Sequence, residues 1–247
     1  MNAAVTVFFL IIKVFSLYFL AVSLFGLCRR RTPEPAARLR RFAVLIAARN
    51  EESCIAGLIE SLRAQHYPPE LVDIWVLPNN CTDRTAEAAR RAGAQVLEMP
   101  ASVRSKGAAL HTAAKALLRS TRNYDAFCVF DADNEADPAF LSEMNRALDR
   151  TAIVKSRILA KNRTQAGISA CYEIYFCSAN HFLNRAREAV GLSARVIGTG
   201  FAIRRDLLET LDGFPCRTLT EDAELYAACL CRGARIGYCE TAVTYDE

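Results

Sequence analysis

The sequence has ten cysteines but no Cys-x-x-Cys pair, and it has three histidines in 247 residues. His66, His111 and His181 do not lie near cysteine pairs at the spacing that zinc ligands need, so no zinc site is predicted. The cysteines are scattered, mostly inside apolar segments. This pattern is typical of small hydrophobic side chains in a reducing compartment.

Charged residues are nearly absent from residues 3–28, where Lys13 is the one charged side chain. A stretch of roughly 20 apolar residues is enough to span a bilayer. Lys13 near its middle would cost about 2.5–3.5 kcal/mol, and snorkelling or pairing with another helix would reduce that cost. A cleaved signal peptide is disfavoured, because no Lys or Arg precedes the apolar stretch and no small-x-small cleavage site follows it. We predict a retained transmembrane helix over residues 3–28.

Acidic residues are scarce in the next segment, residues 29–41, which holds six arginines and a single glutamate. Its charge of +5 exceeds the +4 of the whole chain, so the basic balance does not indicate a nucleic-acid-binding surface. With its two prolines the segment is predicted to be an extended juxtamembrane linker. The positive-inside rule then places residues 42–247 on the cytoplasmic side of a single-pass protein of the inner or plasma membrane.

From residue 42 onward, short apolar segments alternate with alanine-rich segments that have helical spacing. This alternation predicts an α/β domain with a largely parallel sheet and helices on its faces. A longer helix is expected over residues 168–188, either packed on the sheet or lying at the bilayer surface. The segments interpreted as strands are residues 42–47, 72–77, 95–98, 127–130, 152–158 and 235–239.

Polar residues follow the first strands of this predicted sheet. Ligands of such sheets bind beyond the carboxyl ends of the strands, so these residues are expected to meet at one edge. Asp131 and Asp133 stand one residue apart at such an end, where two carboxylates can share a divalent cation with a phosphate-bearing ligand.

Two clusters in the second half of the chain extend this prediction. Gly198, Thr199 and Gly200 place two glycines around one hydroxyl, which lets the backbone approach a ligand closely. Thr220, Glu221 and Asp222 form a second acidic cluster. An N-cap at Thr220 with Asp222 in the first helical turn explains this cluster equally well, so the residues alone leave both interpretations open.

Taken together, these residues resemble family-2 glycosyltransferases, especially the membrane-bound bacterial polysaccharide-synthase-like members. The resemblance runs from residue 42 to residue 247 and implies a Rossmann-like GT-A fold, a nucleotide-diphosphate-sugar donor, a Mg²⁺ or Mn²⁺ ion, and inversion at the anomeric carbon. The motifs that carry it, in the order of the family, are Ala-Arg-Asn-Glu-Glu at 48–52, Asn-Cys-Thr-Asp-x-Thr at 80–85, Lys-Gly at 106–107, Asp-Ala-Asp at 131–133, Gly-Thr-Gly at 198–200 and Thr-Glu-Asp at 220–222.

The resemblance implies a nucleotide side of the site. Ala48, Arg49 and Glu51 would border the nucleoside, and Lys106 would lie beside the nucleotide. Asn79 stands where the family usually carries an acidic residue that contacts the base. An amide offers both a donor and an acceptor, so Asn79 can still pair with uracil, although the departure weakens the case for a uridine donor.

The resemblance also implies a reaction side. Asp131 would face the ribose or sugar and, with Asp133, hold the metal between the diphosphate oxygens. Residues 198–200 would line the donor sugar and the acceptor. Asp222 would be the general base, with Glu221 supporting it.

The leading hypothesis is therefore a membrane-anchored, metal-dependent transferase that moves a sugar to the hydroxyl of a lipid-linked or glycan acceptor at the cytoplasmic face. One alternative is a non-catalytic nucleotide-sugar-binding partner or a fragment, because the sequence ends before the Gln-x-x-Arg-Trp segment of processive members. A shortened enzyme that adds one sugar is also consistent with this end. A sugar nucleotidyltransferase is disfavoured, because no glycine-rich loop follows Ala47.

Overall fold

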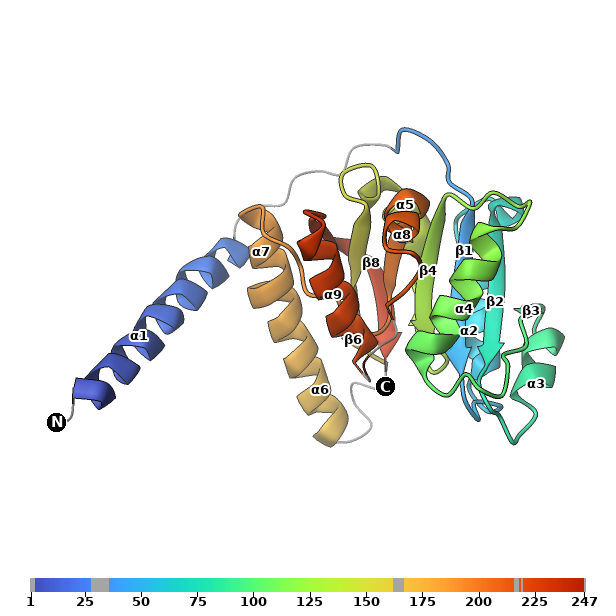
Figure 1. The fold of residues 1–247 in the computed structure, drawn as a ribbon, viewed down its shortest axis with the longest axis horizontal. Helices are drawn as coiled ribbons and strands as arrows, with labels where there is room; N and C mark the ends of the chain where they lie inside the picture. Colours follow the sequence, from blue (N-terminus) through green and yellow to red (C-terminus); the bar gives the residue numbers. More distant parts are fainter. Residues whose placement is uncertain (1–2, 28–35, 162–166, 216–217, 219, 247) are drawn as a thin grey trace.

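The computed structural model describes residues 3–27, 36–161, 167–215, 218 and 220–246. A long helix projects from an α/β domain (Figure 1). This helix, α1 (Ala3–Leu24), continues into a 3-10 turn, η1 (Phe25–Leu27). Among the described residues, Ala3–Leu27 is the one stretch long and apolar enough to cross a membrane, with a mean hydropathy of 2.4. Residues 28–35, which contain the first part of the predicted linker, lie outside the described residues.

The last residues of the predicted linker pack on the domain. Arg40 is buried, and its guanidinium lies 2.5 Å from Oδ1 of Asp149 and donates to the carbonyl oxygen of Asn145 at 2.8 Å. Arg38 forms an exposed ion pair with Asp125 at 3.1 Å. Within the predicted linker, the described residues Arg38 and Arg40 therefore contact the domain, and the rest of the linker stays a prediction.

The domain is built on an eight-stranded sheet, counted over the described residues, in the order β3-β2-β1-β4-β7-β6-β8-β5. Strands β3, β2, β1 and β4 are parallel, and so are β6 and β8, whereas β7 runs antiparallel to both of its neighbours. The sheet is mixed and mostly parallel, as predicted. The strands are β1 (Phe42–Ala48), β2 (Val72–Pro78), β3 (Gln95–Val96), β4 (Ala126–Asp131), β5 (Glu135–Ala136), β6 (Ile153–Ala160), β7 (Phe201–Arg204) and β8 (Ile236–Asp246).

Helices cover both faces of the sheet, which gives two hydrophobic cores (Figure 1). Successive side chains of β1 alternate between them: Phe42 and Val44 pack toward α2 and α5, and Ala43 and Leu45 pack toward α4. Both faces are buried, which explains the continuous apolar segments of the sequence. The helices of the domain are α2 (Ile55–Arg63), η2 (Pro69–Leu71), α3 (Thr85–Arg91), α4 (Lys106–Leu118), α5 (Phe140–Ala147), α6 (Gly167–Ser178), η3 (Ala179–Arg185), α7 (Ala186–Ala189), α8 (Arg205–Thr210) and α9 (Glu221–Cys231).

Three elements differ from their predicted form. The strand expected over residues 95–98 is only two residues long, Gln95–Val96. Directly after it, the backbone N–H of Leu97 donates one further hydrogen bond to the carbonyl oxygen of Val76. The long helix expected over residues 168–188 contains a π-helical stretch, Ala179–Arg185, between α6 and α7. Strand β8 extends to Asp246, because it pairs with β6 as far as Ala160.

Candidate active site

The carboxyl ends of β1, β2 and β4 form one edge of the sheet, and the predicted nucleotide side follows them. Ala48 is in register with Pro78, and Ala47 is in register with Asp131. The backbone N–H of Asn79 donates to the carbonyl oxygen of Ala48 at 2.9 Å, which fixes the loops after β1 and β2 to each other. The expected convergence of these strand ends is therefore present.

The side chains of this edge hold one another in place. Oδ1 of the buried Asn79 accepts from Nδ2 of Asn80 at 2.8 Å. The carboxylate of Glu51 accepts from Sγ of Cys54 at 3.1 Å, and Arg49 is exposed. These residues lie around the loop after β1, where the nucleoside was predicted to bind, and that role stays a prediction.

Lys106 connects the strand edge to the second half of the chain. It is the first residue of α4, and its ammonium donates to Oδ1 of Asp131 at 2.5 Å and to the carbonyl oxygen of Gly198 at 2.7 Å. It also lies 3.5 Å from Oε1 of Glu221. One cation thus contacts three of the predicted motifs, each at a residue that is 25 or more positions from Lys106 in the sequence.

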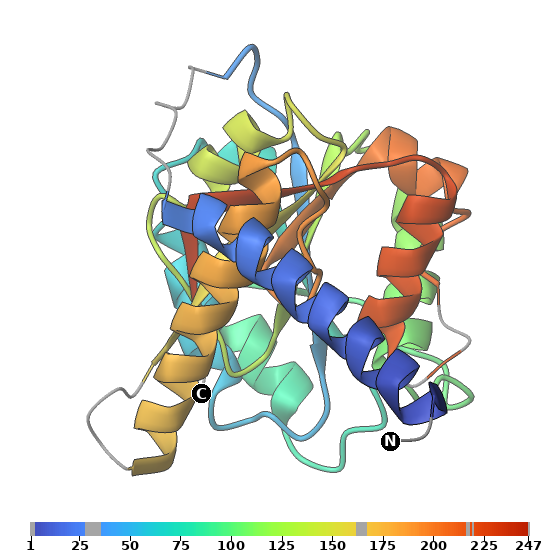
Figure 2. The ribbon, with the colours of Figure 1, turned by 90° about the vertical axis from the view of Figure 1, so that its left-hand side faces the viewer.

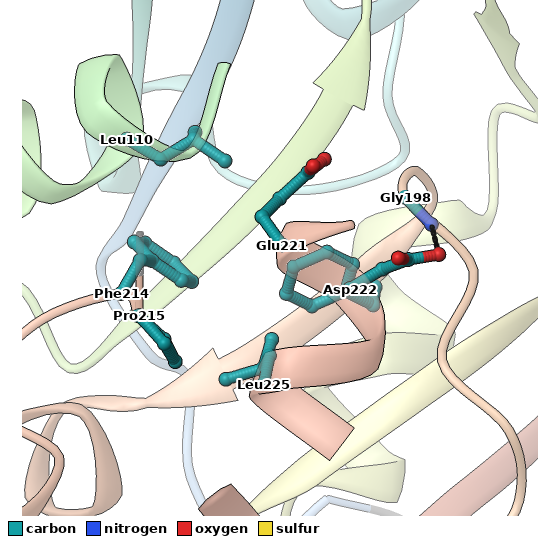
Figure 3. Close-up of a pocket in the computed structure, with 8 residues that line it drawn as sticks. Leu110, Gly198, Phe214, Pro215, Glu221, Asp222 and Leu225 are labelled. Carbon is teal, nitrogen blue, oxygen red and sulfur yellow. Dashed lines mark hydrogen bonds between the residues drawn. The ribbon is translucent and has the colours of Figure 1, made fainter. Parts of the chain in front are cut away.

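Asp222 joins the same cluster from the first turn of α9. Its Oδ2 accepts from the backbone N–H of Gly198 at 3.2 Å, and its Oδ1 accepts from that of Ala223 at 2.7 Å. Figure 3 shows Asp222 turned toward Gly198 while Glu221 extends in a different direction. Thr220 occupies the N-cap position, but its side chain makes no capping hydrogen bond within the described part of the chain. The geometry favours Asp222 as a group facing the glycine turn over a purely capping cluster.

A pocket separates the acidic cluster from the hydrophobic core beneath it (Figure 3). One side carries the two carboxylates, and the opposite walls are apolar. The cavity is small, about 10 Å³, which is roughly the space of one water molecule, so it marks where the carboxylates meet the core and is not itself a sugar-sized site. Its lining residues are Leu110, Gly198, Phe201, Phe214, Pro215, Glu221, Asp222 and Leu225.

Sequence reasoning missed the buried support of the Gly-Thr-Gly turn. Lys155, on β6, is 1 % exposed and donates to the carbonyl oxygens of Thr199 at 2.7 Å and Gly200 at 3.2 Å. Burial lowers the pKa of this lysine to about 7, while the negative charges of Asp246 and Asp131 oppose that shift. The available signal was a lysine in the middle of a segment predicted to be a strand.

Asn134 and Asp246 are two further missed residues. Oγ1 of Thr199 accepts from the backbone N–H of Asp131 at 3.0 Å and donates to Oδ1 of Asn134. Nδ2 of Asn134 then donates to Oδ1 of Asp246 at 2.7 Å. The buried Thr199 and Asn134 therefore tie the acidic motif to the turn and to the end of β8.

The acidic motif has the chemistry for a divalent cation. Burial raises the pKa of Asp246, and the negative charges of Asp133 and Asp131 add to that rise. Among the described residues, no group of three His, Cys, Asp or Glu side chains is arranged to hold a metal alone. Two carboxylates completed by phosphate oxygens are a common Mg²⁺ arrangement, and the metal-binding role of Asp131 and Asp133 stays a prediction.

Curated relatives of this chain include a probable glycosyltransferase, YdaM, from Bacillus subtilis, which is 26% identical over 226 residues. That match covers 87% of this chain and 52% of the relative. A beta-monoglucosyldiacylglycerol synthase from Synechocystis is 27% identical over 193 residues, with 74% and 38% covered. The chain thus spans about half or less of the length of these relatives.

Solved structures with this fold include a mannosyltransferase from Pyrobaculum calidifontis in complex with GDP-Man and Mn²⁺. Its TM-score is 0.73 at 20% identity, and the match covers 93% of this chain and 63% of that one. Glucosyl-3-phosphoglycerate synthase from Mycobacterium tuberculosis, with Mn²⁺, UDP and phosphoglyceric acid, gives 0.57 at 23% identity, over 84% and 71% of the chains. These likenesses establish the GT-A fold.

The family model described as glycosyltransferase like family 2 matches residues 40–247, which is the whole domain that carries the described site. The resemblance inferred from the motifs is confirmed, and the chain belongs to glycosyltransferase family 2.

Proposed function

We propose that this chain is a membrane-anchored, metal-dependent, inverting glycosyltransferase that moves a sugar from a nucleotide diphosphate to an acceptor hydroxyl. The observation that carries the proposal is the position of Lys106, whose ammonium contacts Asp131, the Gly198 carbonyl and Glu221. It connects the motif proposed to hold the diphosphate with the motif proposed to activate the acceptor. Family-2 membership and the Mn²⁺ and nucleotide complexes of its structural neighbours support this assignment.

On the donor side, Asp131 and Asp133 would hold the cation, and Lys106 would lie beside the diphosphate. The ion, when bound, neutralises the charge that builds on the leaving nucleoside diphosphate. Lys106 supplies a second, fixed positive charge at that place without transferring a proton. Lys106 pairs with Asp131 here, so diphosphate binding would exchange one anionic partner for another.

On the acceptor side, Asp222 is the proposed general base. Its Oδ2 touches the Gly198 N–H, and the turn at residues 198–200 would line the reacting sugar. A carboxylate within hydrogen-bond reach of an acceptor hydroxyl can take its proton as the hydroxyl attacks from the face opposite the diphosphate. The turn keeps its shape because Lys155 and Asn134 hold its carbonyl and hydroxyl groups from beneath.

The membrane anchor is the described helix Ala3–Leu27, whose length and composition suit a bilayer span. Its apolar side chains are exposed almost throughout, as expected of a helix surrounded by lipid. We propose that the domain lies on the cytoplasmic side, next to a lipid-linked or glycan acceptor. The glycolipid synthases among the relatives support a membrane location.

The test is sugar transfer by the full chain and its Asp222→Asn variant in lipid nanodiscs, with a panel of nucleotide-sugar donors and Mn²⁺ present. The variant should bind donor normally but transfer roughly 10²–10⁴-fold more slowly. Asp206→Asn is the matched control, because Asp206 is exposed and pairs with Arg204 outside the site. Donor binding without transfer by the unaltered chain, across the whole panel, would instead support a non-catalytic nucleotide-sugar-binding partner.

A further inference from the structure

The helical segment α6–η3, residues 167–185, has its polarity inverted relative to an ordinary surface helix. Three of its polar side chains, those of Glu173, Asn180 and Asn184, point toward the domain. The Glu173 carboxylate accepts from the backbone N–H of Ala160 at 2.9 Å, and Nδ2 of Asn180 donates to the carbonyl oxygen of Ile158 at 2.6 Å. Oδ1 of Asn184 accepts from the backbone N–H of Arg195 at 2.9 Å.

The outward side of the same segment carries no charge among its described residues. Tyr172, Ile174, Tyr175 and Phe182 are 49%, 67%, 54% and 48% exposed. A helix on the surface of a soluble domain normally shows charged and polar residues to water. The exposed residues of α6–η3, named here the outer face, are Gly167, Ala170, Cys171, Tyr172, Ile174, Tyr175, Ser178, Phe182 and Leu183.

The outer face is continuous with the end of the proposed membrane helix. The Oγ of Ser23 donates to the carbonyl oxygen of Phe182 at 3.2 Å. Gly26 packs so closely that an added Cβ would lie 2.4 Å from the carbonyl oxygen of His181. Helix α1 thus leaves the domain directly beside the outer face, so lipid around the end of α1 also reaches η3.

The direction of α6 agrees with a position along a membrane surface. In Figure 2, the blue helix α1 crosses the orange segment that contains α6 and α7, and α1 contacts η3 and α7 at their junction. A helix that contacts the end of a membrane-spanning helix and crosses it there is placed to lie along the bilayer surface. Tyrosine and apolar side chains on one side are typical of helices at the boundary between headgroups and acyl chains.

We propose that the outer face of α6–η3 is immersed in the headgroup–acyl boundary of the bilayer that α1 crosses. The proposal rests on the membrane anchoring proposed above and not on the transfer chemistry. Its consequence is orientation of the active site. Lys161, at the end of β6 and six residues before α6, donates to the carbonyl oxygen of Asp133 at 3.3 Å. Immersion of α6 would therefore hold the acidic motif near the membrane surface.

Native Cys171 lies on the outer face and is exposed, so it can carry a polarity-sensitive fluorophore. The full chain would be reconstituted in nanodiscs of neutral and anionic lipids, with its other accessible cysteines replaced by serine. Glu87→Cys on α3, at the opposite end of the domain (Figure 1), is the matched water-exposed position. Val14→Cys reports insertion of α1.

The label at Cys171 should be quenched by nitroxide lipids and protected from aqueous iodide, with the reverse pattern at Glu87→Cys. Adding Ile174→Glu should shift the Cys171 label several-fold toward iodide accessibility, whereas Leu230→Glu, an exposed apolar residue on α9, should not. If iodide reaches the label at Cys171 while nitroxide lipids quench the label at Val14→Cys, the proposal is overturned and the anchor is left intact. Iodide accessibility at both positions would contradict the anchor and, with it, this proposal. Because the experiment does not measure sugar transfer, its outcome does not depend on whether the proposed transferase activity is correct.

Discussion

Lys155 lies beneath the Gly-Thr-Gly turn, and its ammonium donates to the carbonyl oxygen of Thr199 at 2.7 Å. The lysine is on β6 and the turn precedes β7, so the contact exists only because these two strands pair. It gives the turn a second lysine contact besides that of Lys106, which donates to the carbonyl oxygen of Gly198.

The stability of the fold should rise with pH because of Lys155. Burial lowers its pKa in the folded state to about 7, against an ordinary value of 10.5. Between these values the unfolded chain binds more protons than the folded one, so the free energy of unfolding rises by up to about 1.4 kcal/mol per pH unit. Below pH 7 both states hold the proton, and this contribution is constant.

The substitution Lys155→Met should remove this rise of the free energy of unfolding with pH. Denaturant unfolding of both proteins in the same detergent, from pH 7 to pH 10, should show the unaltered protein gaining stability relative to the variant. Other titrating groups are common to both proteins and cancel in the difference. Parallel stability curves over that range would contradict the assignment of a depressed pKa to Lys155.

Gly200→Ala should destabilise the fold strongly. Gly200 has a φ of +60°, and an added Cβ would lie 2.5 Å from Oγ of Ser156 and 2.7 Å from Oγ1 of Thr244. The backbone conformation alone costs about 1–2 kcal/mol for a residue with a Cβ, and overpacking adds roughly 1–3 kcal/mol.

The control for this substitution is Gly191→Ala. Gly191 has a φ of +76° but no atom within 4 Å of an added Cβ among the described residues, so the change should cost only the backbone term. Thermal unfolding of both variants tests the difference. Equal losses would mean that close packing at Gly200 does not contribute.

Much of the donor side could be predicted from the sequence, because it depends on local pattern. Residues 127–130 are an apolar run followed by two aspartates, and parallel strands bring their carboxyl ends together whatever the details of the loops. The ends of β1, β2 and β4 accordingly meet, and Lys106 stands at the start of a helix next to them.

The support of the Gly-Thr-Gly turn could not be predicted in the same way. It depends on β7, a strand of four residues that lies antiparallel between β4 and β6. A short apolar run does not encode its partners or its direction, so no local pattern places Lys155 under Thr199. The inverted polarity of α6 could not be predicted for a related reason. Tertiary packing decides which side of a helix faces the domain, and the local sequence does not encode that packing.

Lys106→Met should lower kcat/KM for sugar transfer roughly 10²–10³-fold, the range expected when one fixed group that stabilises developing negative charge is removed. Lys115→Met is the matched control, because Lys115 lies on the same helix and pairs with the exposed Asp212 away from the site. Steady-state kinetics with the donor varied would separate the two. A similar decrease in both variants would indicate damage to α4 and not a specific role for Lys106.

Asp133→Asn should raise the concentration of Mn²⁺ needed for half-maximal nucleotide binding. Asp133 and Asp131 are the proposed ligands, and the loss of one of two carboxylates leaves the cation held by a single charge and the phosphates. Titration of Mn²⁺ in the presence of a fixed nucleoside diphosphate measures this directly, without turnover. Asp206→Asn should match the unaltered protein, since Asp206 pairs with Arg204 on the surface. An unchanged Mn²⁺ requirement in Asp133→Asn would remove Asp133 from the metal site while leaving the role of Asp222 to be judged on its own kinetics.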